Sequence, residues 1–158
     1  MEAPVREDLA ARPLLWILRH LEALGEVSRA RLELIAGSWR RVLDDAERRA
    51  SMIGSRGSGN EGDRGSGGDR GRRDRDEAIG VAIERAIWRI DRFVPGSTCI
   101  HRALAGQRML LRRRVEARVV VGLRKREELE GHAWIEIGAD APKLRLFVED
   151  GAYDEVSA

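Results

Sequence analysis

Apolar residues recur at helical spacing through the first third of the chain. Steps of three and four residues place the members of a first stripe on one face of a helix. They are Leu14, Ile17, Leu18, Leu21 and Leu24. Gly25 permits a break, and a second stripe follows it. Its members are Leu32, Ile35, Trp39, Val42 and Ala46. The pattern predicts a helical N-terminal region at residues 1–50, interrupted at Gly25.

Two further helices are predicted between residues 77 and 114. The first has an apolar face of isoleucines and an alanine at helical spacing, and Pro95 and Gly96 end it. Ser97 or Thr98 is a suitable N-cap for the second, so Cys99 falls in its first turn. Its expected buried stripe is Ile100, Ala103, Leu104, Gln107, Leu110 and Leu111. Arginines at 112–114 suit the C-terminal end of its dipole.

The last third of the chain alternates apolar and polar residues as strands do. Residues 115–125 form a first predicted strand, 132–137 a second and 144–148 a third. In the second strand, Ala133, Ile135 and Ile137 point one way, whereas His132, Trp134 and Glu136 point the other. The prediction is an α+β fold in which a cysteine-bearing helix precedes a small antiparallel sheet.

The segment 51–76 has a different composition from the rest of the chain. It consists almost entirely of Gly, Ser, Arg and Asp, and such a segment cannot bury enough apolar surface to offset its ordering entropy. We therefore predict a flexible linker between the N-terminal region 1–50 and a core at 77–158. Its arginine–glycine pattern resembles RNA-binding tails, but acidic residues interrupt the arginines and no aromatic residue is present for stacking.

Composition reduces the number of function classes that the chain could belong to. Charged residues make up 35% of the chain, but its net charge is only +2, which does not favour nucleic-acid binding. No apolar run approaches the ~20 residues of a membrane span, and the first residues do not form a secretory signal. The single cysteine cannot form an internal disulfide, which fits a reducing compartment. We expect a cytoplasmic protein without cofactor or metal.

Cys99 and His132 are the candidate catalytic pair. A helix start favours the thiolate and offers backbone N–H groups that can stabilise an oxyanion. A histidine on a later strand can act as the base. The alternatives are a cysteine that packs as a small apolar residue and a histidine that is a polar strand-edge residue. His101 is turned about 200° from Cys99 on the helix, and we expect it to face solvent.

A carboxylate should orient the imidazole, as in other catalytic triads. Four lie within reach along the sequence: Glu136, Asp140, Glu149 and Asp150. Asp150 follows the third strand, which would lie beside the His132 strand in an antiparallel sheet. The competing interpretation is that Asp150 and Gly151 form a turn, and the residues leave this choice open.

The chain resembles the leader peptidases of lasso-peptide biosynthesis, which are small transglutaminase-like, papain-like cysteine proteases. The resemblance rests on VPGSTCIHRALAGQRMLLRRRVEARVVVGLRK and GHAWIEI, and it is to the stand-alone form of the enzyme. It implies a papain/transglutaminase-like core, with Cys99 as nucleophile, His132 as base and Asp150 as acid, Glu149 in reserve. It also implies three partners: a precursor peptide, a separate leader-recognition protein and a macrolactam synthetase. The insert at 51–76 departs from the family.

Two other functions are consistent with these residues. The same fold can be a non-catalytic scaffold for the synthetase and the precursor, in which case Cys99 would not react unusually fast with an alkylating agent. It can also be another acyl-transfer enzyme, such as a transglutaminase, which would join an amine to its substrate instead of hydrolysing it.

Overall fold

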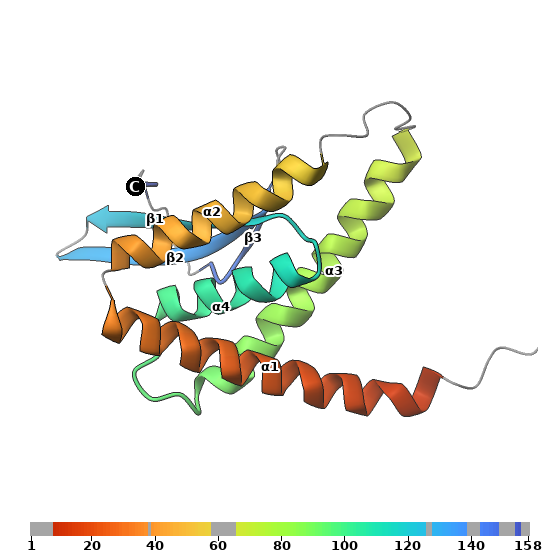
Figure 1. Ribbon diagram of the computed structural model, residues 1–158, viewed down its shortest axis with the longest axis horizontal. Helices are drawn as coiled ribbons and strands as arrows, with labels where there is room; N and C mark the ends of the chain where they lie inside the picture. Colours follow the sequence, from red (N-terminus) through yellow and green to blue (C-terminus); the bar gives the residue numbers. More distant parts are fainter. Residues whose placement is uncertain are drawn as a thin grey trace, which may run out of the picture.

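The computed structural model describes residues 8–37, 39–57, 66–125, 128–138, 143–148 and 154–155. Four helices are followed by the strands of one sheet, and Figure 1 shows their arrangement. The helices are α1 (Asp8–Ala36), α2 (Trp39–Gly57), α3 (Ser66–Asp91) and α4 (Cys99–Arg112). The strands are β1 (Ala117–Lys125), β2 (Leu129–Ile137), β3 (Leu144–Leu146) and β4 (Asp154–Glu155). The α+β prediction is confirmed.

The sheet is antiparallel, with strand order β3-β2-β1-β4. β1 pairs with β2 along its whole length, from Ala117 opposite Ile137 to Lys125 opposite Leu129. The three predicted strands are present, and β4 is an additional short strand on the outer side of β1. Because β3 is short, it pairs with β2 only from Ile135 to Ile137 among the described residues.

Helix α4 lies between α1 and the sheet (Figure 1) and is buried along nearly its whole length, from His101 to Leu111. Gly106 permits the close approach to the sheet. A Cβ at this position would lie 2.7 Å from the Cδ1 of Ile135 and 2.8 Å from the Cε2 of Phe147. Real Cβ contacts are longer than this, so the absent side chain sets the distance between α4 and β2.

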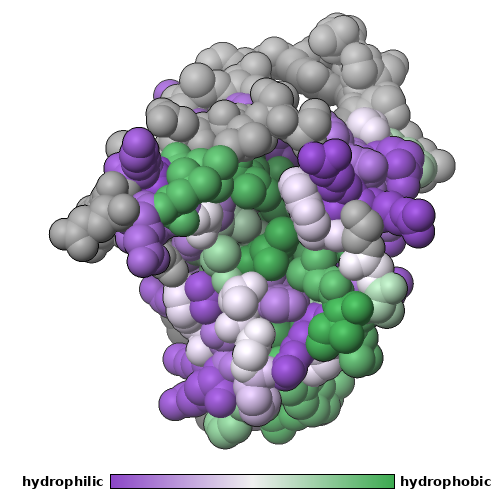
Figure 2. Space-filling view, turned by 90° about the vertical axis from the view of Figure 1, so that its left-hand side faces the viewer, coloured by the Kyte–Doolittle hydropathy of each residue, from purple (hydrophilic) through white to green (hydrophobic). Residues whose placement is uncertain are grey.

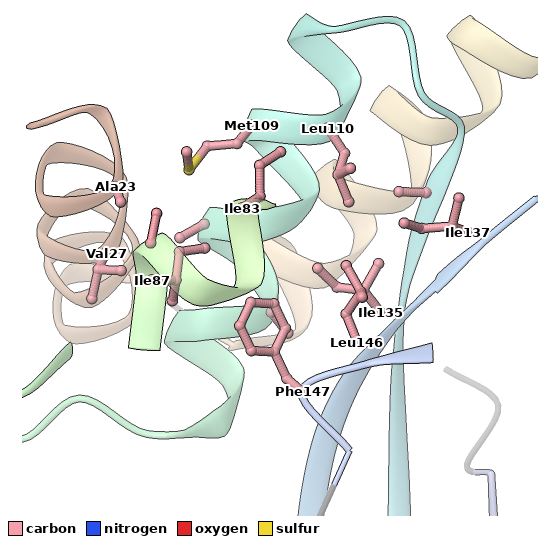
Figure 3. Packing of buried hydrophobic residues seen from close by; sticks show 14 of the residues in the cluster. Ala23, Val27, Ile83, Ile87, Met109, Leu110, Ile135, Ile137, Leu146 and Phe147 are labelled. Atoms are coloured by element: carbon pink, nitrogen blue, oxygen red, sulfur yellow. The ribbon is translucent and has the colours of Figure 1, made fainter. Parts of the chain in front are cut away.

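One apolar cluster joins the helices to the sheet (Figure 3). It contains residues from α1, α3, α4, β2 and β3. The residues labelled in the figure are Ala23, Val27, Ile83, Ile87, Met109, Leu110, Ile135, Ile137, Leu146 and Phe147. The N-terminal helices therefore share a core with the part of the chain that carries Cys99.

The predicted break at Gly25 is wrong, because α1 continues through Gly25 to Ala36. Glycine within a helix costs about 1 kcal/mol relative to alanine, and burial of Ala23 and Val27 on either side of Gly25 outweighs that cost. Helix α1 ends later, at Ala36, and α2 begins at Trp39.

The first predicted stripe is helical but does not form the buried face. Its leucines and isoleucine are exposed, and the residues of α1 that pack inside the molecule are mainly small, such as Ala23, Val27 and Ala30. Figure 1 gives the reason, since the first half of α1 extends beyond α3 and α4. None of the described helices is long and apolar enough to cross a membrane.

The predicted linker at 51–76 is largely helical where it is described. Helix α2 continues to Gly57 and α3 begins at Ser66, while residues 58–65 lie outside the described residues. Side chains of opposite charge four positions apart, as Arg72 and Asp76 are, add to helix stability. Composition alone missed these helices because each is continuous with a patterned helix outside the segment, α2 on its N-terminal side and α3 on its C-terminal side.

Candidate functional site

Cys99 is the first residue of α4, as predicted, and its side chain is half-buried. Thr98 is the N-cap, with an extended backbone. The carbonyl oxygen of Thr98 accepts hydrogen bonds from the N–H groups of His101 (3.1 Å) and Arg102 (3.3 Å). The N–H groups of Cys99 and Ile100 precede these first bonds of the helix, in the position where helix termini bind anions.

His101 was expected to face solvent, and this is wrong: its side chain is buried. The ring folds back so that its Nδ1 accepts a hydrogen bond from the N–H of Thr98, at 2.9 Å. Nδ1 must then be unprotonated. Burial lowers the pKa of His101, and the positive charge of Arg31 lowers it further. A neutral imidazole thus caps the helix that begins with Cys99, in the manner of the glutamate of a capping box.

His132 is buried near the start of β2, and its Nε2 lies 2.8 Å from the carbonyl oxygen of Phe147. Because a carbonyl oxygen can only accept a hydrogen bond, Nε2 carries the proton. In the neutral ring the lone pair of a base is then on Nδ1. The backbone of Phe147, just after β3, therefore fixes both the orientation and the tautomer of the imidazole.

Cys99 and His132 lie at the same end of the contact between α4 and β2. The chain reverses after α4, so that Ala117 pairs with Ile137 and the C-terminal end of α4 lies near the end of β2. Gly106 contacts Ile135. Cys99 precedes Gly106 by seven residues, which is about 10 Å along the helix. His132 precedes Ile135 by three residues, which is also about 10 Å along the strand. Figure 1 shows both element starts on its left side.

The two side chains do not share a sheet face by strand alternation. Ala133, Ile135 and Ile137 belong to the core that contains α4, so His132 alternates to the opposite face. Its ring forms a hydrogen bond with the carbonyl oxygen of Phe147. Within the described part of the chain, β3 pairs with β2 only from Ile135 to Ile137, so the edge of β2 next to His132 is not covered by β3. The ring could reach Cys99 only around this edge. The catalytic pairing of Cys99 with His132 stays a prediction.

Three of the four candidate carboxylates, Asp140, Glu149 and Asp150, lie outside the described residues. The fourth, Glu136, is buried and pairs with Arg118 (2.9 Å), Lys143 (3.2 Å) and Arg145 (3.1 Å). Burial alone would raise the pKa of Glu136, but these hydrogen bonds and charges lower it. Glu136 is four residues from His132, about 13 Å along the strand. It therefore cannot orient that imidazole.

Arg102 holds the first turns of α4 against α3. Its guanidinium donates to a carboxylate oxygen of Asp91 at 3.0 Å and lies 4.3 Å from the ring centroid of Trp88. A cation over an aromatic face is stabilising when it is desolvated, as here. These contacts fix the start of α4, and with it the position of Cys99, relative to α3.

Figure 2 views the end of the molecule at which α4 and β2 begin. Apolar surface gathers in the centre of this view, with charged residues around it. Exposed large apolar side chains close in sequence to these element starts include Phe93, shortly before α4, and Leu129, the first residue of β2. Among the described residues, no group of three or more His, Cys, Asp or Glu side chains could hold a metal ion.

The family model described as the transglutaminase-like superfamily matches residues 41–145, from α2 to β3. The matched segment contains Cys99 and His132 and ends before Glu149 and Asp150. No curated protein and no solved structure matches the chain. This superfamily suggests cysteine-peptidase or acyltransferase-type activity. Because the match covers more than half of the sequence, the chain belongs to the transglutaminase-like superfamily.

Proposed function

We propose that the protein is a cysteine peptidase that removes the leader from a lasso-peptide precursor. The observation that carries the proposal is the position of Cys99 as the first residue of α4, at the same end of the contact between α4 and β2 as His132. The superfamily supports thiol chemistry. The lasso-specific part rests on the sequence resemblance around Cys99 and GHAWIEI. The exposed apolar surface at this end of the molecule suits the binding of a polypeptide.

The reaction begins when His132 accepts the proton of the Cys99 thiol. The thiolate attacks the carbonyl carbon of the peptide bond between leader and core, and the N–H groups of Cys99 and Ile100 stabilise the oxyanion. The carbon–nitrogen bond then breaks as His132 returns the proton to the departing core amine. Water hydrolyses the leader thioester. Asp150, with Glu149 as the alternative, is the triad acid: it accepts from the Nε2–H beside the carbonyl oxygen of Phe147 and stabilises the imidazolium that forms.

The proposal includes three partners. The substrate is a ribosomally made precursor peptide, and a separate leader-recognition protein presents its leader. An ATP-dependent macrolactam synthetase then uses the amine that the cleavage exposes. Neither a cofactor nor a nucleic acid takes part.

The test is cleavage of the purified precursor, in the presence of the leader-recognition protein, followed by mass spectrometry. Leader and core fragments should appear with the wild-type protein and not with Cys99→Ala. Equal cleavage by both would end the proposal. Circular dichroism of the variant provides the control that it has folded.

Two added measurements separate the proposal from its alternatives. A labelled primary amine that becomes joined to the leader would indicate a transglutaminase. Alkylation by iodoacetamide tests for a scaffold, because Cys99 is the only thiol of the chain and the label reports on this residue alone. A catalytic thiol should react much faster near neutral pH than a cysteine in an unfolded peptide, and His132→Gln should slow the reaction.

A further inference from the structure

The backbone of Phe147 connects α3 to His132. Its N–H donates to the Oε1 of Glu84 on α3, at 2.6 Å, and its carbonyl oxygen lies 2.8 Å from the Nε2 of His132. Phe147 thus contacts the Glu84 carboxylate through its N–H and the His132 imidazole through its carbonyl oxygen. Glu84 lies on α3 and His132 on β2, so Phe147 links two polar side chains that come from different elements.

Phe147 has a backbone conformation that must be held in place. Its φ is 61°, in the left-handed region that residues other than glycine rarely adopt. The buried ring, against Gly106 and Trp88, holds the side chain. The Glu84 carboxylate holds the backbone, because a charged acceptor forms a strong, short hydrogen bond with an N–H group.

We infer that Glu84 is a positioning residue: through the backbone of Phe147 it fixes the orientation and the Nε2–H tautomer of His132. The inference rests on the proposed function, in which Nδ1 of His132 must carry the lone pair that accepts the thiol proton. Without the Glu84 bond, the backbone at Phe147 can relax towards negative φ, and its carbonyl then turns away from the ring. The imidazole then loses its hydrogen bond to this carbonyl oxygen, which favours the Nε2–H tautomer.

The experiment is a long-range proton–nitrogen NMR correlation on the uniformly ¹⁵N-labelled full chain, which distinguishes the two neutral tautomers and the imidazolium. The chain has three histidines, and His132→Gln identifies the signals of His132. In the wild type these signals should show the Nε2–H form. Glu84→Leu should give a mixture of tautomers, whereas Glu84→Gln, which keeps an oxygen acceptor, should retain the wild-type pattern.

Glu77→Leu is the matched control, since Glu77 is an exposed glutamate on the same helix. It should leave the signals of His132 unchanged. Where Glu84→Leu does not fold, Glu84→Asp takes its place, because the carboxylate is then one methylene short of the N–H of Phe147. A purely structural role of Glu84 would lower the melting temperature of these variants without changing the tautomer, and that result overturns the inference.

Kinetics of precursor cleavage provide the second measurement. Glu84→Leu should lower kcat by about 10-fold or more and leave KM near the wild-type value, because general base catalysis contributes roughly 10²–10⁴-fold and substrate contacts are unchanged. Glu84→Gln should restore kcat. The NMR result does not require cleavage, so an altered tautomer in a chain that cleaves no precursor would count against the proposed function and not against the role of Glu84.

Discussion

The two ends of α4 differ in what their polar residues contact. At the N-terminal end, the polar groups around Cys99 bond to nearby parts of the chain: His101 bonds back to Thr98, Arg102 pairs with Asp91, 11 positions earlier, and the thiol is half-buried. At the C-terminal end, arginines pair with glutamates of α1, far away in sequence. The pairs are Arg108 with Glu26 and Glu33, Arg112 with Glu22 and Glu26, and Arg113 with Glu22.

The two ends of α4 therefore have different roles: the C-terminal end stabilises the fold, and the N-terminal end carries the candidate nucleophile. The C-terminal end is fixed to α1 by ion pairs of which the one between Arg108 and Glu26 is nearly fully buried. Burial alone would raise the pKa values of Glu22 and Glu33, but their arginine partners lower both pKa values. The N-terminal end has a local cap and a thiol that solvent can reach. A helix whose C-terminal end is fixed to α1 and whose first turns are fixed to α3 by Arg102 can present an accessible nucleophile at its start.

The largest expected effect is at Cys99. Cys99→Ala should lower the rate of precursor cleavage by about 10⁴-fold or more, as loss of a nucleophile does. It should change the free energy of unfolding by less than about 1 kcal/mol, because the side chain is small and half-buried. Cleavage kinetics and urea denaturation measure the two quantities. A large loss of stability would assign Cys99 a packing role and remove the contrast between the ends.

The second effect is at Arg108. Arg108→Met should lower the free energy of unfolding by about 3 kcal/mol, because Glu26 would lose one partner in a buried site. Arg72→Met, which removes an exposed partner of Asp76, should cost about 0.5 kcal/mol or less. Urea denaturation measures both free energies of unfolding. An equal decrease for the two variants would mean that the buried pair does not stabilise the packing of α4 against α1.

The third effect concerns two glycines with different surroundings. Gly106→Ala should destabilise the protein by about 1–2 kcal/mol, since its Cβ would press against Ile135 and Phe147. Gly25→Ala should stabilise it by about 0.5–1 kcal/mol, because no atom lies within 4 Å of that Cβ. Melting temperatures that shift in the same direction for both would contradict the close approach of α4 to β2.

The smallest effect is the pH dependence that His101 contributes. Its pKa is lower in the folded protein than the value of about 6.5 for an unfolded chain, so the unfolded state binds more protons between the two values. The contribution to stability is therefore full above pH 7 and is lost as the pH falls through about 6.5 towards the folded pKa. His101→Asn should remove this part of the decline. Parallel curves of unfolding free energy against pH for the two proteins would contradict it.

Sequence patterns located the elements of the site but not its contacts. The N-cap at Thr98 and the breaking residues Pro95 and Gly96 act locally, so the start of α4 at Cys99 could be predicted. Alternation likewise predicted the strand that carries His132. The bond from Phe147 to that ring has no sequence signal, because every residue has the same backbone carbonyl. The burial of His101 was not predicted, because helical position alone does not show that its ring folds back to the N-cap.

What the sequence determined by itself is therefore the set of local elements: helices from periodic apolar residues and caps, and strands from alternation, including the α4 start at Cys99. The tertiary structure decided which faces are buried. It left the large stripe of α1 exposed while burying its small residues, and it turned the aliphatic face of β2 towards α4. The physical reason is that burial depends on which elements meet, and the approach of α4 to β2 depends on Gly106, where the determining feature is the absence of a side chain.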